Sequence, residues 1–121
     1  ADVMASHNFW IIVDEIYGEL AYDGDLPSLI EVAPELKNRI VIVDGVSKTY
    51  AMTGWRIGWI IAPTQIASAV DMMQGQATSN AAAVSQHAAL AALTSSREDF
   101  EKMREVFKAR RDSTEFLDST V

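Results

Sequence analysis

The sequence predicts an α/β fold in which a mostly parallel sheet is flanked by helices. Two apolar runs, residues 9–13 and 39–43, are separated by a polar connection, the order of elements typical of a parallel strand pair. Helical periodicity dominates the chain from residue 64 onward. The 121 residues, 49% of them hydrophobic, are enough for one modest core.

Three strands are expected in the first half of the chain. Residues 9–13 lack the alternation of a half-exposed strand, so we expect a strand that is buried on both faces and followed by Asp14. The second strand is expected at residues 39–43. A third apolar run, residues 56–62, follows too closely for a helical crossover, so we expect it to pair antiparallel with the second strand.

Helices are expected from residue 64 to the end. Thr64 is predicted to cap the first helix and Gly75 to end it. An alanine-rich helix is expected from about Asn80 to Leu93. A third helix is predicted to begin at Ser96, with an apolar stripe that we expect to be uncovered in this chain, made of Phe100, Met103 and Phe107.

Composition argues against several classes of function. The net charge is −7, and no long block of basic residues is present, which disfavours a nucleic-acid groove or an anionic membrane surface. The chain has no cysteine, and His7 and His87 lack ligand spacing, so we expect no metal site. Without an 18-residue apolar run or a basic-then-apolar leader, we expect no membrane span and a cytoplasmic location.

The segment from Gly45 to Gly58 carries the strongest chemical signal. It places Lys48 in a turn of small residues, where a lysine amine can form a Schiff base with an aldehyde. Gly45 and Ser47 keep the neighbouring side chains small, so an aromatic cofactor can approach the backbone. Arg56 adds a planar fork of donors suited to phosphate oxygens. The segment is thus predicted to attach an aldehyde cofactor through Lys48 and to bind its phosphate through Arg56.

Asp14 is expected at the carboxyl end of the first strand, the edge where open α/β sheets bind ligands. A buried carboxylate there requires a cation or a protonated nitrogen, such as a pyridinium N–H. An ionised Asp14 would keep such a ring protonated and maintain it as an electron sink. Tyr17 lies three residues further on, close enough to bring its phenol to an oxygen of the same ring.

The residues Asp14-Glu15-Ile16-Tyr17 and the run from Ser47 to Trp59 resemble the class I/II aminotransferases of pyridoxal-phosphate (PLP) fold type I, nearest the bacterial aspartate and aromatic subgroup. The resemblance implies that Lys48 is the catalytic Schiff-base lysine and proton shuttle. It also implies that Asp14 is the partner of the pyridine nitrogen, Tyr17 the donor to the phenolate oxygen and Arg56 the phosphate clamp. Many relatives place a phosphate-binding serine where this chain has Gly45, and Ser47 is expected to replace that contact.

The resemblance also implies an incomplete enzyme. The family's upstream glycine-rich phosphate loop, stacking aromatic residue and asparagine have no counterpart here, nor does the small domain with its carboxylate-binding arginine. We therefore interpret residues 1–121 as an internal segment of the PLP-binding large domain, in which residues from about 97 to 121 form a long helix leading toward the small domain. This fragment is expected to be inactive when isolated.

The function implied is transfer of an amino group between an amino acid, of aspartate or aromatic type, and a 2-oxo acid, by a homodimer. Two alternatives share the same cofactor residues. One is a PLP-dependent β-lyase or synthase of the same fold. The other is the PLP-sensing, aminotransferase-like domain of a transcription regulator.

Overall fold

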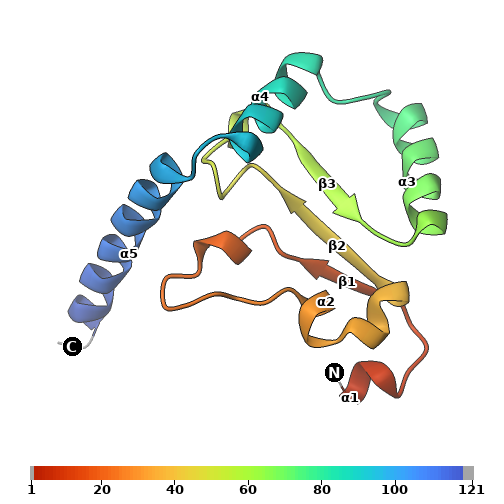
Figure 1. Cartoon of the computed structure of the whole chain (residues 1–121), viewed down its shortest axis with the longest axis horizontal. Helices are drawn as coiled ribbons and strands as arrows, with labels where there is room; N and C mark the ends of the chain where they lie inside the picture. Colours follow the sequence, from red (N-terminus) through yellow and green to blue (C-terminus); the bar gives the residue numbers. More distant parts are fainter. Residues whose placement is uncertain (1, 119–121) are drawn as a thin grey trace.

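A computed structural model describes residues 2–118 as a three-stranded sheet with helices around it (Figure 1). The strands are β1 (Ile11–Asp14), β2 (Ile40–Gly45) and β3 (Gly58–Ile61), with β2 in the centre. β1 pairs with β2 in parallel, and β2 pairs with β3 antiparallel. Both predicted pairings are confirmed, although each strand is shifted or shortened by a few residues.

Short helical segments precede β1 and connect it to β2. They are α1 (Asp2–Ala5), η1 (Gly18–Leu20), α2 (Leu29–Val32) and η2 (Pro34–Arg39). Helix α2 begins with a capping box, in which the Ser28 N–H donates to Oε2 of Glu31 over 3.0 Å. The Ser28 hydroxyl donates to Oε1 of Glu15 over 2.8 Å, which ties the start of α2 to the residue after β1.

The main core lies between the sheet and the α2–η2 segment. Ile40 is 1% exposed, and it packs in a cluster with Ile11, Ala33, Leu36 and Ile42. Ala33 and Leu36 come from the connection, whereas the isoleucines come from β1 and β2. Burial of these side chains fixes the connection against one face of the sheet.

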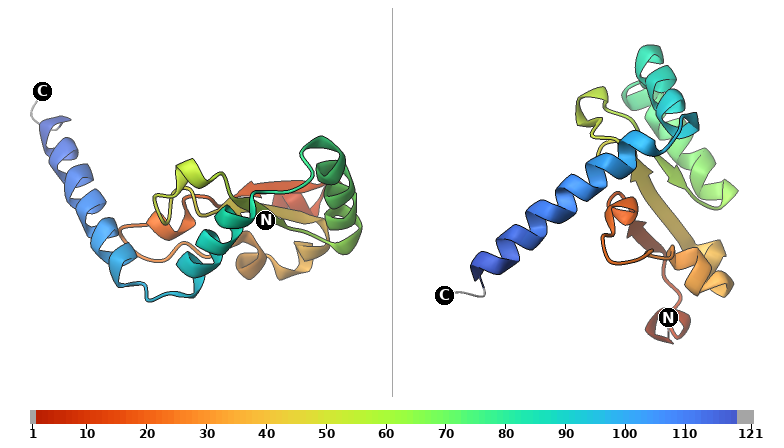
Figure 2. Two further views of the ribbon diagram at one scale, coloured as in Figure 1. Left: turned by 90° about the horizontal axis from the view of Figure 1, so that it is seen from above. Right: turned by 60° about the vertical axis from the view of Figure 1, so that its left-hand side comes forward.

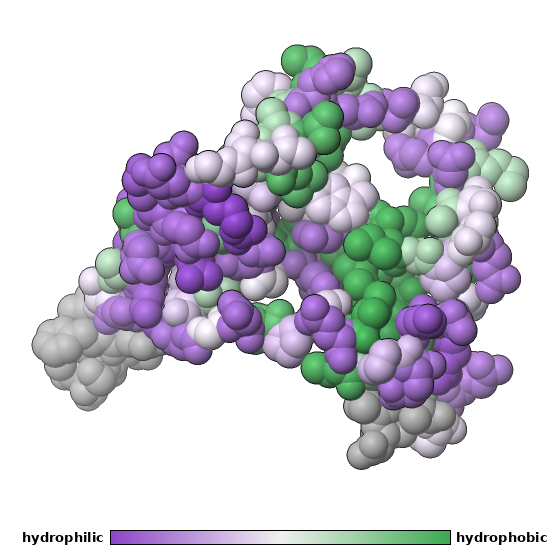
Figure 3. Space-filling view, in the orientation of Figure 1, coloured by the Kyte–Doolittle hydropathy of each residue, from purple (hydrophilic) through white to green (hydrophobic). Residues whose placement is uncertain are grey.

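The opposite face of the sheet is open at β1, where Ile12 is 73% exposed. Ile61 on β3 pairs with Ile42 and therefore shares the α2–η2 face, at an edge where it is 54% exposed. On the α2–η2 side, which Figure 3 shows, apolar side chains gather over the sheet beside that segment. The expectation of a first strand buried on both faces is therefore wrong for this chain, because the α2–η2 segment covers a single face.

Three longer helices follow β3: α3 (Thr64–Ala77), α4 (Ala83–Thr94) and α5 (Glu98–Asp118). Two expected boundaries of α3 are wrong. Pro63 is the N-cap, so Thr64 is the first helical residue and makes no capping bond. The helix also continues through Gly75, since one glycine costs a helix only about 1 kcal/mol relative to alanine.

Helix α5 runs outward from α4 and extends away from the sheet (Figures 1 and 2). The prediction that its apolar stripe is uncovered is wrong at Phe100. This residue is 4% exposed, and its ring lies 6.2 Å from that of Tyr50. The helix extends to Asp118, and residues 119–121 of the predicted long helix lie outside the described part of the chain. Within residues 2–118, no helix has the length and apolar character needed to cross a bilayer.

The core predicts a graded response at Ile40. Ile40→Val should lower the free energy of unfolding by about 0.5 to 1.5 kcal/mol, and Ile40→Ala by about 2 to 5 kcal/mol, because the larger deletion leaves a cavity. Urea denaturation of the full-length protein measures both. Equal losses for the two variants would show that the side chain is not packed as described.

Candidate active site at the carboxyl edge of the sheet

The predicted site residues gather at one edge of the sheet. Asp14 ends β1 and Gly45 ends β2, and the parallel pairing brings these two ends to the same edge. β3 runs in the opposite direction, so its first residue, Gly58, pairs with Gly45 there. Arg56 lies just before β3 and therefore reaches the same edge as Lys48, which follows β2.

The turn that carries Lys48 is anchored on both sides. Val46 is fully buried and Thr49 is 5% exposed, so the backbone around Lys48 is held by packing. The Thr53 hydroxyl donates to the carbonyl oxygen of Ser47 over 3.0 Å and closes the turn. Ala51 has a φ of 52°, a left-handed conformation that is uncommon for a residue other than glycine. Such strain is often found at functional sites.

Lys48 opens into a pocket of about 560 Å³. Its Nζ atom lies 5.6 Å from the ring centroid of Tyr17, within the range of a cation–π contact. Ser47 lines the same pocket. The structure therefore brings together three of the five predicted site residues, Tyr17, Ser47 and Lys48.

Asp14 and Arg56 lie at the same edge but do not line this pocket. The Asp14 carboxylate is exposed and accepts a hydrogen bond from the backbone N–H of Ile16 over 3.1 Å. Arg56 has a φ of 56° and donates through Nη1 to the carbonyl oxygen of Thr53 over 3.3 Å. Both side chains therefore bond to neighbouring residues and not to each other. The prediction that Asp14 is buried is wrong for this chain.

Gly45 has a steric role that its sequence context did not reveal. A Cβ atom at this position would lie 2.8 Å from the carbonyl oxygen of Ile57 and 3.0 Å from Cα of Gly58. The side chain of Ile16 closes the third side at 3.3 Å. The close approach of β2 and β3 therefore leaves no room for a serine side chain at position 45.

Sequence reasoning missed part of the pocket wall. Ala51 and Thr53 lie within the Lys48 segment, but Leu20, Tyr22 and Phe107 come from distant parts of the chain. Phe107 belongs to α5 and was expected to lie on an uncovered stripe. No spacing in the sequence links residue 107 to residue 48, so this contact required the fold.

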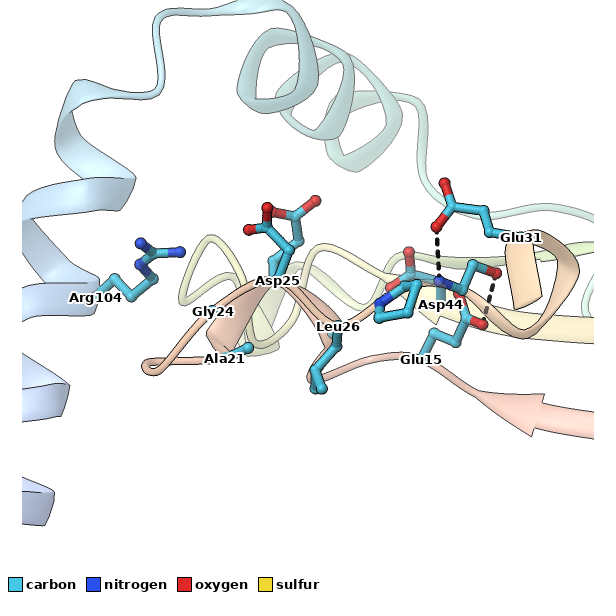
Figure 4. Close-up of a pocket in the computed structure, with 12 residues that line it drawn as sticks. Glu15, Ala21, Gly24, Asp25, Leu26, Glu31, Asp44 and Arg104 are labelled. Atoms are coloured by element: carbon cyan, nitrogen blue, oxygen red, sulfur yellow. Dashed lines mark hydrogen bonds between the residues drawn. The ribbon is translucent and has the colours of Figure 1, made fainter.

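A second pocket, of about 620 Å³, is lined largely by residues of the segment 18–28 (Figure 4). Arg104 of α5 lies at one side of it, and five of its twelve lining residues are acidic: Glu15, Glu19, Asp25, Glu31 and Asp44. Burial raises the pKa of the Asp44 carboxyl, and the nearby carboxylates raise it further, although a 2.6 Å bond from the Gly45 N–H opposes them. In the described residues, no group of histidine and acidic side chains could hold a metal ion.

Comparison with known proteins gives consistent relatives. The family described as aminotransferase class I and II matches residues 1–115. An aspartate aminotransferase of Streptomyces avermitilis is 46% identical over 108 residues, which are 88% of this chain and 26% of that protein. The solved aspartate aminotransferase of Rhizobium meliloti superposes with a TM-score of 0.85 at 39% identity, over 91% of this chain and 28% of that one.

A solved aromatic aminotransferase from Pyrococcus horikoshii OT3 superposes with a TM-score of 0.84 at 33% identity. The match covers 92% of this chain and 30% of that chain. The sequence thus spans between a quarter and a third of the length of these relatives.

The contacts of Gly45 predict that a side chain at this position lowers stability, whereas one at Gly54 does not. Gly45→Ser should lower the free energy of unfolding by about 1 to 3 kcal/mol, because β3 must move to accept the side chain. Gly54→Ser is the matched control, since nothing lies within 4 Å of a Cβ atom there. Thermal or urea unfolding of the full-length protein compares the two. A loss at Gly54 as large as that at Gly45 would contradict the steric explanation.

The raised pKa of Asp44 predicts a pH-dependent effect. Between its unfolded and folded pKa values, the folded protein binds more protons than the unfolded protein, so stability falls as pH rises through this window. Asp44→Asn should therefore be slightly more stable than wild type at neutral pH, and the difference should disappear below the ordinary pKa of aspartate. Urea denaturation across pH measures it. A difference that persists at the acid end would point to a cause other than charge.

Proposed function

The chain belongs to the class I and II aminotransferases, and we propose that the full-length protein is a PLP-dependent transaminase. It would transfer an amino group from an amino acid to a 2-oxo acid. The observation that carries the proposal is the pocket shared by Tyr17, Ser47 and Lys48, in a segment that the family matches throughout. Members of this family depend on PLP.

The residues of the pocket fit this cofactor. The amine of Lys48, the hydroxyl of Ser47 and the phenol of Tyr17 line a pocket of about 560 Å³, and a carboxylate and a guanidinium stand at the same sheet edge. These groups match a molecule with an aldehyde, a phenolic oxygen, a ring nitrogen and a phosphate. Leu20 and Phe107 supply an apolar wall suited to an aromatic ring.

Bound PLP supplies an electron sink for the pair of electrons left when the substrate loses its α-proton. We assign covalent attachment of the cofactor to Nζ of Lys48, which also moves the proton at the substrate α-carbon when it is released. Tyr17 would donate its phenolic O–H to the ring oxygen. The cation–π contact between Lys48 and Tyr17 supports this assignment, since it places both groups on one side of the pocket.

Asp14 and Arg56 are assigned to the ring nitrogen and the phosphate. The present partner of Arg56 is a neutral carbonyl oxygen at 3.3 Å, and a phosphate offers a shorter, charge-assisted bond in its place. The Asp14 carboxylate keeps one oxygen outside its bond to Ile16. Ser47 would donate its hydroxyl to the phosphate. Gly45 cannot make such a contact because it has no side chain.

Substrate, assembly and location are also part of the proposal. Similarity to aspartate and aromatic aminotransferases favours an amino donor of one of these types. We assign residues 1–121 to the large domain, with α5 leading toward a small domain, and we expect a homodimer that acts in the cytoplasm. The exposed apolar side chains of Ile12 and Ile61, on opposite faces of the sheet, are consistent with further parts of the large domain packing there.

The proposal predicts that PLP becomes attached to Lys48. Borohydride reduction of the full-length protein with PLP should add the phosphopyridoxyl group to the peptide that contains Lys48, and Lys48→Ala should abolish this mass increase. Lys102→Ala, a substitution of an exposed lysine on α5, should leave it unchanged. Peptide mass spectrometry is the measurement, and it does not require turnover.

Incubation with aspartate, phenylalanine or tyrosine and 2-oxoglutarate then separates the reaction types. Formation of glutamate supports transamination, whereas release of ammonia and pyruvate from a β-substituted amino acid would identify a lyase. Absence of any adduct on Lys48 in the wild-type protein would overturn the assignment.

A further inference from the structure

The loop of residues 18–25 is fastened to α5 by charged side chains. Nη1 of Arg111 lies 2.5 Å from Oδ2 of Asp23, and Nζ of Lys108 lies 3.9 Å from the other carboxylate oxygen. Near the start of α5, Nη2 of Arg97 lies 2.5 Å from Oε2 of Glu19. The loop and the helix are thus joined at two points, although they are far apart in the sequence.

One of these two points adjoins the Lys48 pocket. Asp23 directly follows Tyr22, which lines that pocket. Phe107, which lines it from α5, lies four residues before Arg111 and therefore on the same face of the helix. The guanidinium carbon of Arg111 also lies 5.1 Å from the ring centroid of Tyr22. Each partner of the Asp23–Arg111 pair is therefore next to an aromatic residue of the wall.

Global stability does not account for this arrangement. Asp23 is 67% exposed, and exposed ion pairs contribute little to the free energy of unfolding. Each partner favours the charged form of the other, since Arg111 lowers the pKa of the Asp23 carboxyl and Asp23 in turn raises that of Arg111. The main effect of the Asp23–Arg111 pair is therefore to hold the loop in one position against α5.

We propose that Asp23 and Arg111 are positioning residues that hold Tyr22 and Phe107 together as the outer wall of the Lys48 pocket. The inference rests on the proposed function for its ligand, because PLP is the molecule whose binding the wall would affect. Its structural part, the fastening of the loop to α5, stands on the contacts alone.

The test compares Asp23→Asn with wild type in the full-length protein. We expect the dissociation constant for PLP to rise roughly three- to fivefold, the order expected when an exposed charged contact is lost. Amide hydrogen exchange in residues 18–25 should become faster in the same variant. Asp23→Glu, which keeps the carboxylate, should recover most of the affinity. Glu98→Gln is the matched control, because it breaks an exposed ion pair with Lys102 within α5 that does not reach the loop.

A double variant, Asp23→Asn with Arg111→Gln, completes the design. If the two residues act as a pair, the double variant should bind PLP no more weakly than the worse single variant. Unchanged exchange in Asp23→Asn would overturn the fastening itself. Faster exchange with unchanged PLP affinity would overturn the positioning role. A wild-type protein that binds no PLP would instead contradict the proposed function, and the exchange data would still decide whether the loop is fastened.

Discussion

The central strand β2 is the constraint on which the arrangement of the site depends. It is paired on both sides, parallel to β1 and antiparallel to β3, so its end fixes where three chain segments meet. Gly45 permits the close approach of β3 because it has no side chain. Lys48 follows three residues later on a turn held by buried neighbours. The position of the lysine is therefore decided by strand pairing before any ligand is involved.

Sequence reasoning predicted the fold class, the three strands and both pairings, because these depend on local apolar runs and connection length. It was less successful where a boundary or a burial depends on what packs nearby. Thr64 and Gly75 carried plausible helix signals, yet Pro63 and continued hydrogen bonding set the limits of α3. The exposure of Ile12 could not be predicted from its apolar neighbours, since it depends on which face the α2–η2 segment covers.

The candidate site divides in the same way. The Lys48 segment and Tyr17 were identified because their chemistry is concentrated in short motifs, and the structure brings them into one pocket. The other half of the wall, Tyr22 and Phe107, has no local signal, because it forms only when α5 returns to the loop after β1. Asp14 and Arg56 reach the predicted edge, but they have local hydrogen-bond partners there.

The loop after β1 separates two pockets of opposite character. Tyr17, Leu20 and Tyr22 line the lysine pocket, whereas Gly18, Glu19 and Ala21 line the acidic one. A single inserted or deleted residue would shift these sets, so that carboxylates would face the lysine and aromatic rings the acidic side. The length of this loop is therefore under tighter constraint than its composition, and evolutionary change here should proceed by substitution rather than by insertion or deletion.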